Sequence, residues 1–413
     1  MRSTLKAQDL QVRASPPDGS MFATFDHYKM PLGPDGTPYQ YLEALRDEVV
    51  ATGRPINWSN AYGGFWVVGG WEQSKQIHEN TADFSNVATT FPPYATPSGK
   101  PFFLSGQDEP EHGRYRKMVQ APFTRARAKA MLDQLRDIAS MLVDLVDGRD
   151  RFDICTATDL MPGYTFCAIV GLSMDDAPKF ERFVKAMVEG ALDPEGVAPT
   201  LAEMAEYWST LVEQRRASPN DGLLSEIINS EYDGEKLTDE ELLEFFSVLL
   251  LGGFDNTQRF LGNAFYRLAW HQELRRRLVC YPELIPQAVD ELLRLDGPAC
   301  TFRLVRNAIS IGGVEMQPGQ IAGLIHPLAN RDPGRFEYPD NFIIGRPSAN
   351  RHLTFGLGIH HCLGAFLAHA EGVAFIEKFL ERIPEFHLDV ERPAQWISGQ
   401  VGGMHSVSVV LSR

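Results

Sequence analysis

A cysteine inside a glycine-rich segment is the most specific chemical signal in the chain. The segment reads Phe355-Gly-Leu-Gly-Ile-His-His-Cys-Leu-Gly364, and a helical pattern runs from about Leu363 to Arg382. A cysteine at the N-terminal end of a helix is favoured as a thiolate, because the helix dipole and the free backbone amides stabilise negative charge. Such a thiolate is a nucleophile or a soft metal ligand. The three glycines of the segment allow unusual backbone dihedrals and the close approach of a flat partner.

Other chemistry for this segment fits less well. A dinucleotide loop of the Gly-x-Gly-x-x-Gly type would need a glycine where His361 stands, and no strand precedes the segment. A cysteine hydrolase would need a histidine beside Cys362 in space, which adjacency in sequence does not provide. A buried cysteine at a glycine turn, with no chemical role, is the remaining alternative.

The cysteine count excludes several kinds of metal site. The five cysteines stand at positions 155, 167, 280, 300 and 362, and no two have Cys-x-x-Cys spacing. Disulfide scaffolds, zinc ribbons, iron–sulfur clusters and c-type haem attachment need paired cysteines. Single cysteines therefore remain, and Cys362 is the one placed for chemistry.

Composition narrows the class of protein further. The chain has 413 residues, 44% of them hydrophobic and 23% charged, which is typical of a globular protein. A net charge of −15 argues against nucleic-acid binding through phosphates. The first thirty residues lack the apolar core of a signal peptide, and Glu244 interrupts the most apolar stretch, 242–254. We expect a cytoplasmic protein that binds neither nucleic acid nor membrane.

The elements that must position Cys362 are mainly helical. Apolar residues at three- and four-residue spacing predict helices over 111–296, with breaks at Gly148, Gly171, Pro194, Pro219 and Gly234. Thr238-Asp-Glu-Glu241 is a capping box that begins a helix lasting to about Trp270. Its centre is apolar nearly all round, so we expect this helix to be buried in the middle of the molecule.

The rest of the chain supplies short helices, small sheets and one long loop. Thr37-Pro38 predicts a helix to about Val50, residues 63–70 a strand and 71–79 a short helix. Residues 85–107, rich in proline and aromatic side chains, predict a functional loop. Strand patterns occur at 302–311, 313–316, 319–325 and 404–411. We predict a mainly α fold with small β-sheets, formed by one domain over 21–413 after a flexible N-terminus at 1–20.

The cysteine segment resembles the haem-thiolate loop of the cytochrome P-450 family, Phe-x-x-Gly-x-His/Arg-x-Cys-x-Gly, at every defined position. The family's Glu-x-x-Arg signature is present as Glu291-Leu-Leu-Arg294, about 70 residues before the cysteine, with Arg346 as the expected partner. The resemblance implies the fold of this family, with haem between the long central helix and the helix after the cysteine. It also implies that Cys362 is the axial ligand of the haem iron, within the loop residues Phe355, Gly358, His360 and Gly364.

The third family signature departs from its usual form. Gly252-Gly-Phe-Asp-Asn-Thr257 carries Asn256 where the family has a threonine, and Thr257 is rotated by about 100° from that position. We expect Asp255 to bring protons from outside, and Asn256 to hydrogen-bond dioxygen or position a water. An amide cannot relay protons as a hydroxyl does, so a water or an oxygen of the substrate must assist. A buried Asp-Asn pair that only supports the helix is the alternative.

The resemblance also suggests where haem and substrate lie. The carboxylates of haem b should meet cations and imidazoles, for which motif positions indicate His112, Arg116, Arg303 and His360. The apolar regions expected around a compact hydrophobic substrate contain Phe91, Tyr94, Phe102, Phe103, Gly252, Gly253, Cys300, Phe302 and Val401. The 187–193 region should contribute as well.

Within the family, the chain is most similar to the soluble bacterial terpene-hydroxylating branch that contains the cineole monooxygenases. The resemblance rests on the Leu-Leu-Gly-Gly-x-Asp-Asn-Thr helix, Arg267-Leu-Ala-Trp270 and Glu273-Leu-Arg-Arg-Arg-Leu278. It implies monooxygenation of a small terpenoid-like substrate with O₂. Electrons would come from NAD(P)H through a ferredoxin- or flavodoxin-type partner and its reductase.

The sequence says less about where the electron donor docks and which type of activity the protein has. We expect the electron donor to dock on local cations near the cysteine, namely Arg114, Lys117, Arg125 and Arg127. A peroxide-using or non-oxygenating haem-thiolate enzyme, and a haem sensor or carrier without turnover, are the alternative functions.

Overall fold

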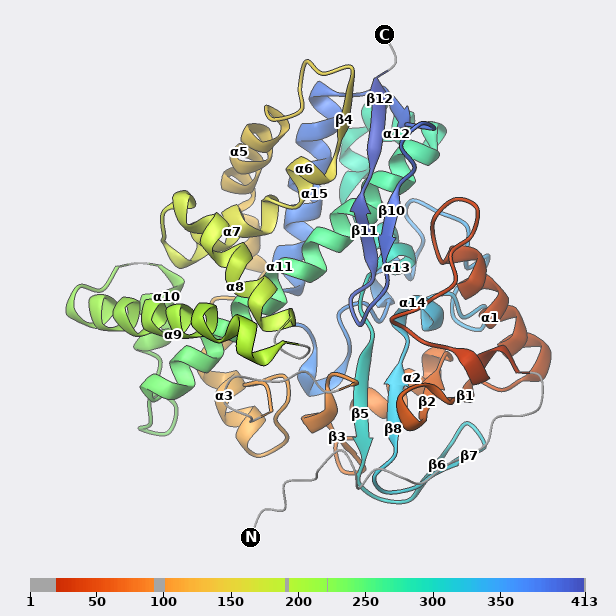
Figure 1. The fold of residues 1–413 in the computed structure, drawn as a ribbon, viewed down its shortest axis with the longest axis horizontal. Coiled ribbons are helices and arrows are strands. Elements are labelled where there is room, and N and C mark those ends of the chain that lie inside the picture. Colours follow the sequence, from red (N-terminus) through yellow and green to blue (C-terminus); the bar gives the residue numbers. More distant parts are fainter. Residues whose placement is uncertain (1–19, 93–100, 190–192, 221, 412–413) are drawn as a thin grey trace.

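The computed structural model describes residues 20–92, 101–189, 193–220 and 222–411. Helices gather on one side of the molecule and most strands on the other, and α11 runs between them (Figure 1). The α-helices are α1 (Tyr39–Thr52), α2 (Trp71–Glu79), α3 (Glu111–Val119), α4 (Arg125–Ala130), α5 (Leu132–Val143), α6 (Cys155–Thr158), α7 (Met161–Val170), α8 (Ala177–Glu189), α9 (Pro194–Ala217), α10 (Leu223–Ile228), α11 (Asp239–Trp270), α12 (Gln272–Cys280), α13 (Ile285–Asp296), α14 (His326–Ala329) and α15 (Ala365–Arg382). The predicted mainly α class is therefore confirmed.

The strands form small sheets beside the helices. They are β1 (Ile56–Ser59), β2 (Phe65–Val68), β3 (Phe84–Ser85), β4 (Arg151–Asp153), β5 (Thr301–Val305), β6 (Ile309–Ile311), β7 (Val314–Met316), β8 (Ile321–Leu324), β9 (Phe386–Leu388), β10 (Gln395–Ile397), β11 (Gly403–Ser406) and β12 (Ser408–Leu411). The main sheet has the order β1-β2-β8-β5-β3, in which β2 and β8 are parallel and the other pairs antiparallel. A second sheet has the order β4-β12-β9, and β6-β7 and β10-β11 pair separately.

Several predicted elements end or divide differently in the structure. The segment 111–296 is not wholly helical, because β4 pairs with β12, more than 250 residues away. The strand predicted at 302–311 is two strands in different sheets, and so is the one at 404–411. The helix after the cysteine begins at Ala365, and Pro38 is the N-cap of α1 instead of its first residue. The predicted flexible segment 1–20 lies almost entirely outside the described residues.

The central helix α11 follows the sequence prediction closely. The Thr238 hydroxyl accepts from the backbone N–H of Glu241 at 3.2 Å, and the Glu241 carboxylate accepts from the N–H of Thr238 at 2.7 Å. The helix ends at Trp270, as predicted. Its C-terminal half packs with α5, α13 and α15 in one apolar core, and its N-terminal half packs with α7–α10 in another.

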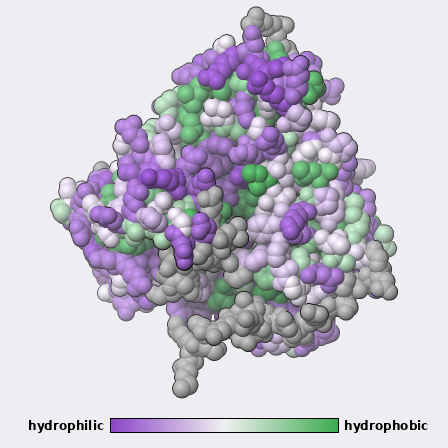
Figure 2. All heavy atoms as spheres, viewed as in Figure 1, coloured by the Kyte–Doolittle hydropathy of each residue, from purple (hydrophilic) through white to green (hydrophobic). Residues whose placement is uncertain are grey.

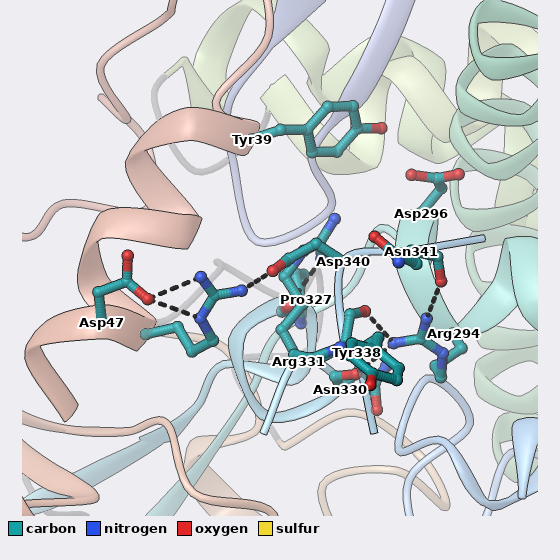
Figure 3. A network of polar contacts seen from close by, with 12 residues as sticks. Tyr39, Asp47, Arg294, Asp296, Pro327, Asn330, Arg331, Tyr338, Asp340 and Asn341 are labelled. Atoms are coloured by element: carbon teal, nitrogen blue, oxygen red, sulfur yellow. Dashed lines mark hydrogen bonds and ion pairs between the residues drawn. The ribbon is translucent and has the colours of Figure 1, made fainter. Parts of the chain in front are cut away.

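A fully buried ion cluster fixes α13 to the chain that leads into the cysteine loop. Both Glu291 oxygens accept from Arg294 at 2.8 Å, and Arg346 donates to Glu291 at 2.9 Å. Arg346 is thus the partner that the sequence predicted. In the neighbouring network, Arg294 also reaches the carbonyl of Asn330 and Arg331 that of Pro327, both at 2.8 Å (Figure 3).

The surface seen in Figure 2 is mainly hydrophilic. Hydrophilic residues dominate the face in Figure 2, and apolar residues show only as small patches between them. Within the ranges that the structure describes, no helix has the length and apolarity that crossing a bilayer requires.

Candidate active site

Cys362 lies on a tight loop that two left-handed glycines shape. Gly356 and Gly358 have φ values of +65° and +70°, which side chains strain to adopt. The Cys362 N–H donates to the Phe355 carbonyl at 2.8 Å, which closes the loop. Cys362 is exposed and lines a cavity. Phe355, Gly358 and Gly364 are therefore close to the cysteine, as predicted, with Phe355 and Gly364 also lining that cavity.

The electrostatics of Cys362 differ from the sequence expectation. Burial raises the pKa of its thiol, while a hydrogen bond from the Gly364 N–H and the charge of Arg116 lower it. Gly364 is the N-cap of α15, so the start of this helix supplies the N–H that favours the thiolate. A metal ion bound to the sulfur would favour the thiolate further.

A cavity of about 370 Å³ separates the cysteine loop from α11. Gly252 and Gly253 line it on α11, and a side chain at either position would meet no atom within 4 Å. The same holds for Gly364 on the opposite wall. Glycines on both walls leave space for a flat molecule between the helix and the sulfur.

Imidazoles and guanidinium groups gather at one side of this cavity. His112, Arg116, Arg303 and His360 all line it, so the structure brings the four predicted residues together. The His112 and His360 rings are 4.0 Å apart between centroids. Burial lowers the pKa of His360 to about 2 and that of Arg303 to about 10. These groups crowd together without a balancing number of carboxylates.

Two further buried histidines, which sequence reasoning missed, extend this cluster. Arg303 donates to Nδ1 of His78 at 3.3 Å, and Nε2 of His78 lies 3.1 Å from Nε2 of His326. Both imidazoles line the cavity. No local motif marks either residue: His78 is the last residue but one of α2, and His326 is the first residue of α14.

This donor set fits a haem. One cysteine sulfur faces the flat space, and the carboxylates of haem would meet the cationic side of the cavity. Nε2 of His112 is buried without a hydrogen-bond partner among the described residues. Across the same residues, no group of three or more histidines, cysteines and carboxylates could hold a metal ion. A single-cysteine site for iron is therefore consistent with the geometry.

The motif residues on α11 divide between two faces. Asn256 and Thr257 both line the cavity, and Thr257 is buried. Asp255 points elsewhere: its carboxylate lies 3.3 Å from Nε of Arg259, one turn along the helix. Burial raises the pKa of Asp255, and the charge of Arg259 opposes this rise.

Most of the predicted aromatic pocket residues do not line the cavity. Phe302 follows Thr301 and precedes Arg303 on β5, and successive side chains on a strand face opposite sides. Because Thr301 and Arg303 face the cavity, Phe302 packs on the other face, in a core with Phe91 and Cys300. The prediction that these three residues line the pocket is wrong.

The other predicted pocket residues have different positions. Phe103 packs against Tyr115 and Phe245 in the helical core, so its assignment to the pocket is also wrong. Phe102 and Val401 are half-buried outside the cavity wall. Tyr94 and residues 190–192 lie outside the described residues. The apolar wall is formed instead by Phe123, Phe166, Ile169, Phe245, Val248 and Leu249, with Gly252 and Gly253 as predicted.

A buried acid on the cavity wall was also missed. Glu371 on α15 is 3% exposed, and its Oε2 has no hydrogen-bond partner in the described part of the chain. Burial raises its pKa to about 8, and Thr165 lowers it. Its position nine residues after Cys362, on the inner face of an amphipathic helix, was a usable signal.

A mainly helical fold, a cysteine loop below a long central helix and a cationic pocket beside it define a haem-thiolate class of protein. The family model for Cytochrome P450, written here P-450, matches residues 198–279 and 283–395. Mycinamicin IV hydroxylase/epoxidase of Micromonospora griseorubida is 33% identical over 308 residues, 72% of this chain and 77% of its own length.

Solved structures agree with this assignment. The crystal structure of CYP101J2 has a TM-score of 0.85 at 25% identity, covering 97% of this chain and all of that one. CYP109E1 from Bacillus megaterium in complex with testosterone has a TM-score of 0.80 at 26% identity, covering 91% and 100%. The chain belongs to the cytochrome P-450 family. It is a P-450 monooxygenase, and its family uses haem, O₂ and electrons from a redox partner.

Proposed function

We propose that this enzyme inserts one oxygen atom into a small, compact hydrophobic substrate of the terpenoid kind. The observation that carries the proposal is the cavity itself. Its wall on α7 and α11 is apolar and includes Phe166, Ile169, Phe245, Val248 and Leu249. A wall of aromatic and aliphatic side chains favours a hydrophobic molecule that buries its surface there. We also propose that the chain works in the cytoplasm as a single domain over 21–413, without nucleic acid or membrane.

In this proposal Cys362 ligates the iron of haem b. Arg116 and Arg303 would balance the charge of the haem carboxylates, and the imidazoles of His112 and His360 would donate hydrogen bonds to them. When bound, haem supplies the reductive activation of O₂ and the transfer of one oxygen atom. The loop residues Phe355, Gly358 and Gly364 shape the space below it.

The residues of α11 would handle protons and water. Asp255 would accept and pass on protons at its carboxylate beside Arg259. Asn256 positions a water or the substrate at the cavity wall, because an amide both donates and accepts but does not release a proton. Gly252 and Gly253 leave room for the substrate, and the apolar wall excludes bulk water.

Spin-state titration tests the substrate class. We expect 1,8-cineole or camphor to convert the ferric enzyme to high spin at lower concentration than testosterone does. Leu249→Phe, which narrows the cavity, should weaken cineole binding about tenfold or more, because overpacking costs about 1–3 kcal/mol. Leu251→Phe, on the same helix but away from the cavity wall, is the matched control. Tighter binding of testosterone than of both terpenoids would refute the compact-substrate proposal.

We propose a ferredoxin- or flavodoxin-type electron donor that docks at the Cys362 face, with a reductase that uses NAD(P)H. Exposed Phe366 carries the guanidinium of Arg125 over its ring at 5.0 Å. The other cations expected there are engaged: Arg114 pairs with Glu235 and Arg127 with Glu226, both at 3.1 Å, and Lys117 donates to Tyr232 at 2.5 Å. Arg125 and Phe366 are therefore the best supported contacts.

A second candidate function is peroxide-driven oxygenation. It is favoured by Asn256, which stands on the cavity wall where the family pattern has a hydroxyl. Product formation with NADH and a ferredoxin system, compared with product formation with hydrogen peroxide alone, separates the two functions. A faster and better coupled reaction with peroxide would favour the second.

A further inference from the structure

A second carboxyl group, Asp159, lies next to the face of α11 that carries Asp255. Asp255, Gln258 and Arg259 lie on one face of α11, since they are three and four residues apart. That face packs against the junction of α6 and α7, where Asp159 follows the last residue of α6. The Gln258 amide donates to the Asp159 backbone carbonyl at 2.7 Å, which fixes the two segments together.

Arg259 acts on both carboxyl groups, through an ion pair with Asp255 and through its longer-range charge on Asp159. Nε of Arg259 lies 3.3 Å from Asp255, and Arg259 is also the strongest favourable charge on Asp159. Its Nη1 donates to the carbonyl of Met404 at 3.2 Å, which holds the guanidinium in place. Two carboxylates beside one cation carry a net charge of −1, so one added proton makes the trio neutral. Burial favours the neutral state.

The Asp159 side chain has the features of a proton-loading group. Its Oδ1 is buried and has no hydrogen-bond partner within the described ranges. Burial raises the pKa of Asp159 to about 7, with Arg259 lowering it and the carboxylates of Asp153, Glu181 and Asp255 raising it.

The charged groups that face Asp159 come from each element packed there. They are Arg259 and Asp255 on α11, Asp153 on β4, Glu181 on α8 and the thiol of Cys155 on α6. The Asp153 carboxylate accepts hydrogen bonds from the backbone N–H groups of Cys155 and Val407 and from the Ser406 hydroxyl. Both of its oxygens therefore have hydrogen-bond partners. Glu181 is exposed and marks the solvent side.

We propose that Asp159 supplies protons to Asp255, so that Asp159, Arg259 and Asp255 together form the entry of the proton path to the cavity. The Asp159 carboxylic acid gives one proton, through an intervening water, to the Asp255 carboxylate. Once Asp255 has passed that proton toward the cavity, a hydronium ion at the surface reprotonates Asp159. Arg259 stays protonated and balances whichever carboxylate is charged. This inference rests on the proposed monooxygenase function, in which Asp255 delivers protons, and Asp159 acts through Asp255 without touching the reacting atoms.

Infrared spectroscopy of the ferric holoenzyme tests the loading step directly. Glu371 also contributes a protonated carboxyl group near neutral pH, so the spectra are compared between variants. We expect the titrating C=O absorption of the wild type to lose one component in Asp159→Asn and to stay unchanged in Glu181→Gln. This readout does not depend on turnover. A titration in Asp159→Asn identical to that of the wild type would overturn the proposal.

Turnover tests the delivery step. In Asp159→Asn, product formed per NADH should fall about tenfold or more and lose its pH dependence near neutrality, with a larger solvent isotope effect. Hydrogen peroxide brings its own protons, so peroxide-driven product formation should remain within about twofold, and Asp159→Glu should restore coupling. Unchanged coupling in Asp159→Asn would overturn the proposal. Absence of product from the wild-type enzyme with either oxidant would instead refute the proposed function, while the infrared titration would still report on the pair.

Discussion

Replacing Glu371 by glutamine should change how stability depends on pH. The carboxyl group is 3% exposed, and burial raises its pKa to about 8 from an ordinary value of 4.5. Between these two values the folded chain holds a proton on Glu371 that the unfolded chain has released. The free energy of unfolding of the wild type therefore falls as pH rises through this window, and the penalty is complete above pH 8.

The magnitude follows from the shift. Each pKa unit corresponds to about 1.4 kcal/mol, so the wild type loses about 3 kcal/mol through this group between pH 4.5 and pH 7. The glutamine side chain does not titrate. The stability of Glu371→Gln relative to the wild type should therefore rise by about the same 3 kcal/mol from pH 4.5 to pH 7.

Urea unfolding of the holoenzyme, followed by circular dichroism at pH 5, 6, 7 and 8, measures this difference. The matched control is Glu377→Gln on the same helix, where the carboxylate pairs with Arg136 at 2.8 Å near the surface. Its stability relative to the wild type should vary by less than about 1 kcal/mol over the same range. An unfolding free-energy gap for Glu371→Gln that stays constant with pH would refute the assignment of a proton to Glu371 in the folded state.

Three further predictions concern the ion cluster, the cysteine and the docking face. Glu291→Gln should lower the free energy of unfolding, measured by urea denaturation, by about 3–5 kcal/mol, because two buried guanidinium groups lose their shared carboxylate. A loss below about 1 kcal/mol would contradict this prediction. Cys362→Ser should abolish the red-shifted Soret band that thiolate ligation gives the ferrous carbon monoxide complex, measured by difference spectroscopy. Arg125→Glu should slow reduction by a ferredoxin in stopped flow, more at low salt than at high, whereas equal rates at every ionic strength would exclude Arg125 from the docking site.

Local patterns in the sequence predicted local structure well. The capping box at Thr238 and Glu241 uses atoms three residues apart, so it depends little on the rest of the fold. The cysteine loop is likewise defined by its own glycines. Glu291 and Arg294 are neighbours on one helix face, and only their partner Arg346 had to come from the family pattern.

Long-range pairing could not be read in the same way. The three residues of β4 carry no strand signal that outweighs the helices around them, and β4 forms only because β12 lies beside it. Phe302 shows a different limit, since an apolar side chain suits a substrate pocket and a core equally well. Neighbouring side chains on a strand point to opposite faces of the sheet. Since Arg303 was expected at the haem, this alternation would have placed Phe302 in the core.

Under the proposed proton path, the geometry of α11 calls for more than one proton-handling group. Asp255 faces the α6–α7 junction, whereas Asn256, the next residue, faces the cavity, and successive helical residues are about 100° apart. A proton must therefore cross from one side of the helix to the other, and the amide at the crossing point cannot pass it on. A water or an oxygen of the substrate must complete the path, so the substrate's own polar group becomes part of the catalytic arrangement. An enzyme with this arrangement should form the most product per NADH consumed with substrates that carry an oxygen atom within reach of Asn256.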